Sequence, residues 1–158
     1  MSWPVPQPGL VICYAYLWRR EALAGQEEGA KDRPCALVLA RKDEEGEMRV
    51  YVLPVTRSPP DEDTEAVPIP AAVKQRHGLD EERSWIVVSE ANVFTWPGPD
   101  LRFVPGKGLE SAAYGFLPPG LFKVVRDRFV GRARRRQAGI VPRSESWLPR
   151  LAPRCGPS

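Results

Sequence analysis

A single arginine at the start of an apolar segment is the residue whose position points most directly to chemistry. The segment KDRPCALVLA (31–40) runs from charged residues into what reads as a buried strand, with Arg33 at its beginning. A guanidinium is planar and presents paired N–H donors, so it can hold two oxygens of a phosphate-like anion. Arg33 is therefore a candidate anion-binding residue. The competing interpretation is a strand-end arginine that extends into solvent.

A threonine at the end of the next predicted strand supports the first interpretation. The segment MRVYVLPVT (48–56) ends at Thr56, and KDEEGE (42–47), in which Gly46 can adopt positive φ, predicts a hairpin turn before it. In an antiparallel hairpin, the start of one strand lies opposite the end of the other. The sequence therefore predicts that Arg33 and Thr56 are neighbours.

Length and composition indicate one domain with a β-rich core. The chain has 158 residues, 42% of them hydrophobic, which suffices for one domain with its own core. Its 18 prolines and 13 glycines favour short strands joined by turns over long helices. The net charge is only +3, yet residues 123–136 hold seven basic residues and one acidic residue. That cluster either attracts a polyanion or forms a solvated helix end.

Cysteine and histidine usage argues against several function classes. Cys13, Cys35 and Cys155 form no CxxC pair and His77 is the single histidine, so we expect no metal and no disulfide framework. We expect His77 at a solvated helix end rather than in catalysis. The sequence shows no signal peptide and no run of about 20 apolar residues, which predicts a cytoplasmic protein without membrane association.

The remaining pattern predicts a small, half-open barrel of five or six short strands, of the mainly β (α+β) class. We expect the strands at 10–18, 33–41, 48–56, 66–70 and 84–90, with shorter pieces at 92–96 and 101–105. The alternation in the third strand places Val50, Val52 and Pro54 on one face and Tyr51, Leu53 and Val55 on the other.

Two helices and two polar segments complete this prediction. A short helix is expected at 70–78 and a C-terminal helix from Pro118, which has apolar residues at helical spacing. Residues 19–32 should form a mobile loop, with room for one helical turn. Residues 137–158 should form a disordered basic tail, which leaves 1–136 as the folded domain.

Four motifs occur in a characteristic order and spacing: PGLV (8–11), KDRPCALVLA (31–40), YVLPVT (51–56) and YGFLPPGLFKVVRDRF (114–129). With them, residues 8–136 resemble the MazF/PemK family of bacterial toxin–antitoxin modules. Family members have a glycine-led first strand, a K-x-R-P before an apolar strand, a strand ending in P-[IV]-T and a proline-started helix.

The resemblance implies an SH3-like or CcdB-like barrel that forms a homodimer. It implies metal-independent cleavage of single-stranded RNA, without a cofactor, and inhibition by a cognate antitoxin protein. Such cleavage uses the ribose 2′-OH as the nucleophile, so it requires proton transfers and stabilisation of charge on the phosphoryl oxygens.

The resemblance also assigns candidate catalytic residues. Arg33 matches the family's catalytic arginine, and Thr56 matches the threonine of P-[IV]-T. Glu90 is a partial match to an acidic residue that some members carry near this point. It would accept a proton or pair with Arg33.

Further residues are candidates for contacting RNA. Arg57 replaces the serine that usually follows the threonine, and Ser58 comes next. Lys31 would add positive potential. Among the aromatic residues Tyr14, Tyr16, Trp18, Phe94 and Trp96, the last lies in FTWPGPD, where we expect exposure and stacking on an RNA base.

Two other functions remain open from the sequence. The first is a non-enzymatic module that binds a protein, as the gyrase-poisoning relatives of this family do. The second is a degenerate toxin kept as a scaffold that binds RNA or protein. The altered P-V-T-R segment and the lack of a clear acid–base pair favour the non-enzymatic module.

Overall fold

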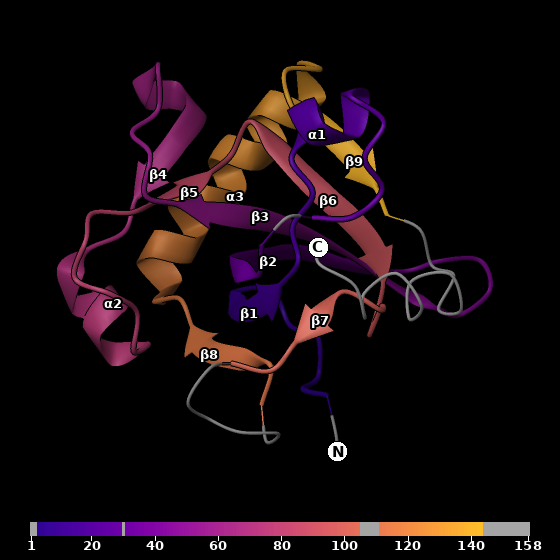
Figure 1. Ribbon diagram of the computed structural model, residues 1–158, viewed down its shortest axis with the longest axis horizontal. Coiled ribbons are helices and arrows are strands. Elements are labelled where there is room, and N and C mark those ends of the chain that lie inside the picture. The colour runs from indigo at the N-terminus through magenta and orange to yellow at the C-terminus, as the bar shows by residue number, and fades with distance from the viewer. Residues whose placement is uncertain (1–2, 30, 105–110, 144–158) are drawn as a thin grey trace.

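The computed structural model describes residues 3–29, 31–104 and 111–143 and consists mainly of antiparallel β-sheet with a few helices (Figure 1). This confirms the expected mainly β, α+β class. The described strands are β1 (Leu10–Tyr14), β2 (Arg33–Lys42), β3 (Met48–Thr56), β4 (Ala66–Pro68), β5 (Trp85–Val87), β6 (Glu90–Thr95), β7 (Leu101–Arg102), β8 (Ala113–Phe116) and β9 (Gly139–Pro142). The described helices are α1 (Arg19–Leu23), α2 (Ala71–Arg76) and α3 (Pro119–Arg134), with a 3-10 turn at Asp63–Glu65.

The sheet is organised around the antiparallel strands β1, β2 and β3, and one path through it runs β4-β5-β3-β2-β1-β7. β3 pairs with two strands along its other edge. β6 pairs with its first half, from Arg49↔Thr95 to Val52↔Asn92, and β5 pairs with its end, at Thr56↔Trp85. The end of β3 that carries Thr56 is therefore held between β2 and β5.

Side chains alternate along β3 and pack into two hydrophobic clusters. Val50 and Val52 pack into one cluster, whereas Leu53 and Val55 pack into the other, so the predicted faces are confirmed for these residues. The first cluster also contains Ile12, Tyr14, Leu37 and Phe94. The second also contains Val11, Ala36, Val38 and Ile86. Burial of both sets fixes the register of the β2–β3 hairpin, because a one-residue slip would exchange the faces.

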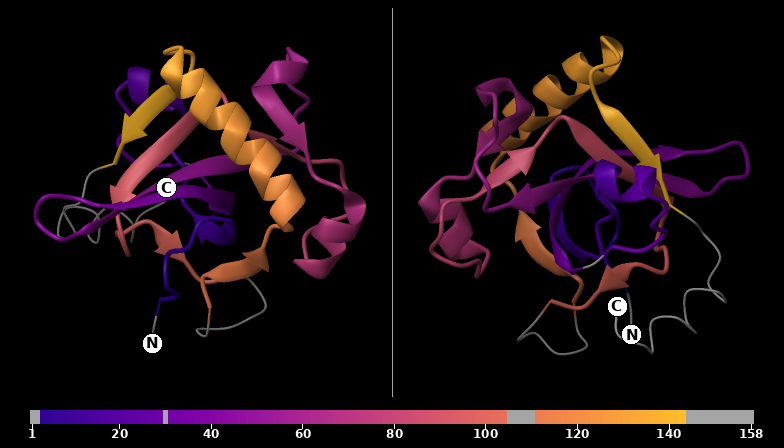
Figure 2. Two further views of the ribbon diagram at one scale, coloured as in Figure 1. Left: turned by 180° about the vertical axis from the view of Figure 1, so that it is seen from behind. Right: turned by 45° about the horizontal axis from the view of Figure 1, so that its top comes forward.

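Helix α3 lies across one face of the sheet, as the view from behind shows (Figure 2). Pro119 stands in its first turn, where the fixed φ of proline suits a helix start. Val125 and Phe129 are one turn apart and buried in the second cluster. The predicted proline-started C-terminal helix is therefore confirmed, and its other positions carry most of the basic residues of 123–136, whereas Arg135 and Arg136 follow its end.

The folded region continues past the expected boundary at residue 136. β9 pairs in parallel with β6, from Glu90↔Gly139 to Val93↔Pro142, and Arg143 is buried. The prediction of a disordered tail is wrong for residues 137–143, whereas 144–158 lie outside the described residues. The basic composition predicted a tail because an arginine is normally exposed. Arg143 can be buried because a carboxylate neutralises it: its Nη2 lies 3.0 Å from Asp100 Oδ2.

The N-terminal third also differs from its expected boundaries. β1 ends at Tyr14, although burial continues to Leu17. α1 occupies the start of the segment expected to be a mobile loop, and the backbone N–H of Arg19 donates to Glu90 Oε1 at 2.9 Å. None of the described helices has both the length and the apolar character needed to cross a bilayer.

Candidate functional site

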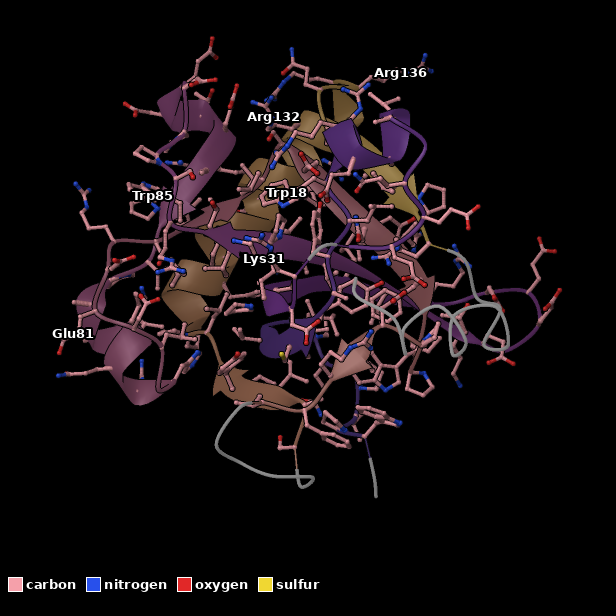
Figure 3. The ribbon with its side chains drawn as sticks, viewed as in Figure 1. Trp18, Lys31, Glu81, Trp85, Arg132 and Arg136 are labelled. Carbon is pink, nitrogen blue, oxygen red and sulfur yellow. The ribbon has the colours of Figure 1, made fainter. Side chains whose placement is uncertain are left out.

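The β2–β3 hairpin brings Arg33 and Thr56 to one pocket. Each lies two residues outward from the register pair Cys35↔Pro54. They line an open pocket of about 440 Å³. The predicted RNA-contacting residues Lys31, Arg57 and Ser58 line the same pocket, as do Trp18, Arg20 and Lys74. The labelled side chains of Trp18 and Lys31 mark its position (Figure 3).

The guanidinium of Arg33 is half-buried and held from two sides. Its Nη1 donates to the carbonyl oxygen of Val55 at 3.3 Å, and its Cζ lies 5.0 Å from the centroid of the Trp18 ring. Its Nε is buried and has no hydrogen-bond partner among the described residues. The neighbouring Asp32 also lines the pocket, and its Oδ1 lies 3.6 Å from Arg102 Nε. Arg33 is therefore a positioned cation with donor capacity left for an anion.

The hydroxyl of Thr56 is oriented by the turn that follows β3. The backbone N–H of Ser58 donates to Thr56 Oγ1 at 3.1 Å. This turn occupies one lone pair of the hydroxyl oxygen and leaves its O–H proton available to a ligand in the pocket. Thr56 can thus donate to the same anion as Arg33, whereas the exposed Ser58 contributes its backbone to the turn.

Two further cations that line the pocket, Arg57 and Lys74, are paired with carboxylates. Arg57 Nη1 lies 2.7 Å from Glu82 Oε2 and 3.7 Å from Asp80 Oδ2. Lys74 is only 4% exposed and donates to Asp80 Oδ1 and Ser84 Oγ, both at 2.6 Å, and to the carbonyl oxygen of Glu82. The pocket cations without a carboxylate partner among the described residues are Arg20, Lys31 and Arg33.

Glu90 lines an adjacent hollow of about 240 Å³ rather than the Arg33 pocket itself. The two hollows share Trp18, Arg20, Thr56 and Ser58. Glu90 Oε1 accepts hydrogen bonds from the Arg19 N–H at 2.9 Å and from the Tyr16 hydroxyl at 3.1 Å. Burial raises the pKa of Glu90, and the two hydrogen bonds oppose that rise. Glu90 is therefore a candidate proton acceptor beside, and not inside, the pocket.

The raised pKa of Glu90 predicts a specific pH dependence of stability. The folded chain holds this proton more tightly than the unfolded chain, so the wild type loses stability as the pH rises above the ordinary glutamate value of 4.5. Glu90→Gln removes that loss. The free energy of unfolding of Glu90→Gln minus that of the wild type should increase with pH, measured by urea denaturation between about pH 4 and pH 8. Glu81→Gln, which removes an exposed carboxylate, is the control, and a flat difference for Glu90→Gln would contradict the prediction.

Trp18 is the site residue that sequence reasoning undervalued. Its ring is contacted by two guanidiniums, with Arg33 Cζ at 5.0 Å and Arg20 Cζ at 4.9 Å from its centroid. Tyr16 packs against it edge-on, with the centroids 5.2 Å apart. The signal that finds it is the β1–β2 register: Tyr14 pairs with Arg33, so the residues just after β1 must lie beside the start of β2.

Trp96 is not brought to this pocket. It lies just after the far end of β6, five residues beyond Ala91, and lines a separate hollow with the acidic residues Asp43, Glu45 and Glu47. Its ring packs against Phe94, with the centroids 6.2 Å apart. Since a strand rises about 3.3 Å per residue, the two ends of β6 lie far apart. Nothing in this placement joins Trp96 to the other predicted residues.

His77 is buried, contrary to the expected solvated helix end. It is 5% exposed, and its Nε2 lies 2.9 Å from the carbonyl oxygen of Phe116. It therefore joins the end of α2 to β8, and it is not among the residues that line the pocket. The cysteines Cys13 and Cys35 are also buried, and burial raises the pKa of both thiols, which disfavours nucleophilic chemistry.

Within the described ranges, no group of three or more histidine, cysteine, aspartate or glutamate side chains is arranged to hold a metal ion. No protein-family model matches the chain, and no curated protein sequence matches it significantly. The resemblance to the MazF/PemK family therefore rests on the four sequence motifs alone.

Proposed function

We propose that this protein is a metal-independent endoribonuclease toxin of the MazF/PemK type. In this proposal the sheet belongs to an SH3-like barrel, and the protein acts in the cytoplasm as a homodimer restrained by an antitoxin. The observation that carries the proposal is the placement of the Arg33 guanidinium beside Thr56 in an open pocket. A guanidinium and a hydroxyl that converge on one solvent-filled space suit a phosphate group.

The geometry supports a reaction in which the ribose 2′-OH attacks the adjacent phosphorus. The new O2′–P bond forms while the P–O5′ bond breaks, which leaves a 2′,3′-cyclic phosphate and a 5′-OH. Negative charge builds up on the phosphoryl oxygens in the transition state. Arg33 stabilises that charge through guanidinium N–H donors that the Val55 carbonyl does not occupy, and Thr56 donates one further hydrogen bond.

Glu90 is the proposed proton acceptor for the attacking hydroxyl. Its pKa is raised by burial, which brings it closer to the working pH of a general base. Its carboxylate faces the hollow that shares Thr56 with the Arg33 pocket, so the attacking hydroxyl would lie between the two hollows. The proton lost from O2′ passes to Glu90, and O5′ leaves protonated by Arg33 or by solvent.

The proposal is tested by incubating the purified protein with long single-stranded RNA in EDTA. We expect fragments with 2′,3′-cyclic phosphate and 5′-OH ends, identified by end-specific labelling and mass spectrometry. Intact RNA would overturn the nuclease. Intact RNA together with growth inhibition in cells would favour the protein-binding alternative, which the neutralised Arg57 supports because that cation is already paired within the chain.

A hydroxyl at position 56 is expected to matter more than the shape of the side chain. Thr56→Val keeps the volume but removes both the O–H donor and the acceptor of the Ser58 N–H. Loss of one transition-state donor lowers the cleavage rate by about 10²-fold. Thr56→Ser retains the hydroxyl and should retain most of the rate, measured in single-turnover cleavage of one RNA. Equal rates for the valine and serine variants would remove Thr56 from the mechanism.

A further inference from the structure

We propose that an arginine patch at the C-terminal end of α3 binds the RNA phosphates that flank the cleaved bond. The patch consists of Arg128, Arg132, Arg134, Arg135 and Arg136. It lies outside both hollows of the site. The inference rests on the proposed function for its ligand and extends the bound strand beyond the pocket.

The patch is not neutralised by neighbouring carboxylates. Four of its members are exposed and Arg132 is half-buried, and none takes part in an ion pair with the described residues. The earlier basic residues of α3 behave differently: Lys123 and Arg126 both pair with Asp127, at 2.7 Å and 3.2 Å. The unpaired positive charge of the 123–136 segment therefore begins at Arg128 and continues to Arg136.

Two of the arginines are anchored so that their outer nitrogens remain available. Arg132 Nε donates to the carbonyl oxygen of Gln137 at 3.1 Å, and Arg135 Nε donates to Gln137 Oε1 at 3.2 Å. The Nη groups of both residues make no hydrogen bond to the part of the chain that the structure describes. These are the groups that bind phosphate oxygens in pairs.

The helix itself does not require so many cations. One or two suffice to offset the dipole at a helix C-terminus, whereas like charges three or four residues apart repel one another. Arg128 and Arg132 have this spacing on one side of α3, and Arg135, the C-cap residue of the helix, follows three positions later. Repulsion that remains uncompensated within the chain indicates an anionic partner.

The patch is connected to the site through α1. The side chain of Arg19 lies against Gly139, just after the patch, and leaves no room there for a Cβ atom. Gly139 N–H donates to the carbonyl oxygen of Ser89 at 2.9 Å, and Ser89 lines the same hollow as Glu90 and Arg20. Lys31, Trp18, Arg132 and Arg136 follow one another from the middle to the top of the view (Figure 3).

The charges around the second hollow favour one path for the strand. Besides Glu90, the carboxylates of Asp61 and Glu65 line the hollow together with Arg20. Phosphates would be repelled from the two carboxylates and drawn along Arg20 and Arg19 toward the patch. Such contacts are made to the backbone of a single strand and carry little sequence preference.

The test compares binding of a short and a long non-cleavable RNA. The probes are mixed-sequence 2′-O-methyl oligonucleotides of about four and about sixteen nucleotides, with fluorescence anisotropy in EDTA at several salt concentrations. The patch variant is Arg128→Gln, Arg132→Gln and Arg135→Gln together. The control variant, Arg41→Gln, Lys42→Gln and Arg76→Gln, removes the same charge from exposed cations outside both hollows.

The patch variant should lose at least about tenfold in its preference for the long over the short RNA. The slope of log affinity against log salt for the long RNA should fall by about 2, since each lost contact to a single strand contributes about 0.7. The control variant should keep the wild-type preference. Equal losses in both variants, an unchanged preference in the patch variant, or no RNA binding by the wild type would overturn the inference. Failure of the nuclease proposal is seen separately, as wild-type protein that binds these probes but leaves natural RNA intact.

Discussion

Arg33→Ala should lower the rate of RNA cleavage by about 10³-fold, because it removes the cation that would stabilise the negative charge on the phosphoryl oxygens. The side chain is positioned by the Val55 carbonyl and the Trp18 ring, and its Nε has no protein partner among the described residues. The loss should fall on the single-turnover rate more than on RNA affinity, since the interaction strengthens as charge develops. Single-turnover cleavage and anisotropy on the same RNA measure the two effects.

Two companion variants make this result specific. Arg33→Lys keeps a positive charge but lacks the planar set of donors, so it should recover only a small part of the rate. Arg41→Ala removes an exposed arginine from the other end of β2 and should behave as the wild type. If Arg33→Ala cleaves RNA at the wild-type rate while Arg41→Ala does too, Arg33 has no catalytic role and the proposed mechanism is wrong.

Arg143→Met should lower the free energy of unfolding by about 3–5 kcal/mol, because it removes the closer of two cations from the buried carboxylate of Asp100, whose other cation, Arg102, lies 3.9 Å away. The side chains of Arg143 and Asp100 are each 1% exposed, with Nη2 3.0 Å from Oδ2. Arg143 Nη1 also donates to the carbonyl oxygen of Ala15 at 2.8 Å and to Asn92 Oδ1 at 2.9 Å. Urea denaturation at one fixed protein concentration measures the change.

Removal of the partner charge separates the ion pair from general packing. The double variant Arg143→Met, Asp100→Leu should recover a large part of the lost stability, since a buried pair replaced by apolar residues costs little. Arg134→Met, at an exposed position of α3, should change stability by less than about 0.5 kcal/mol. An equally small effect of Arg143→Met would mean that the segment after residue 136 contributes little to the fold.

The same network connects the C-terminal strand to the site. Asn92 is fully buried and makes two hydrogen bonds to the backbone of Leu17. Its Nδ2 donates to the Leu17 carbonyl oxygen at 2.8 Å, and its Oδ1 accepts from the Leu17 N–H at 2.9 Å. Leu17 precedes Trp18, whose ring contacts Arg33. Arg143, the residue after β9, therefore supports the position of Trp18 through Asn92.

The sequence pattern predicted a structural feature correctly wherever that feature depends on a single strand or a single helix. Alternation in 48–56 gave the correct faces of β3, and the proline pair before Gly120 marked the start of α3. The hairpin between β2 and β3 is also local, since its turn is short, and it carried the prediction that Arg33 and Thr56 share one pocket. These features depend on residues close in sequence, so periodicity and turn chemistry suffice.

The sequence by itself determined the β-rich class, the hairpin and the two side chains at its open end. Only the tertiary structure decided that Trp18 lies against Arg33, that Trp96 lies elsewhere, and that Arg143 is buried against Asp100. Each of these outcomes depends on contacts between segments distant in sequence. Buried charge pairs and ring contacts form only after the sheet is assembled, so no short stretch of sequence contains them.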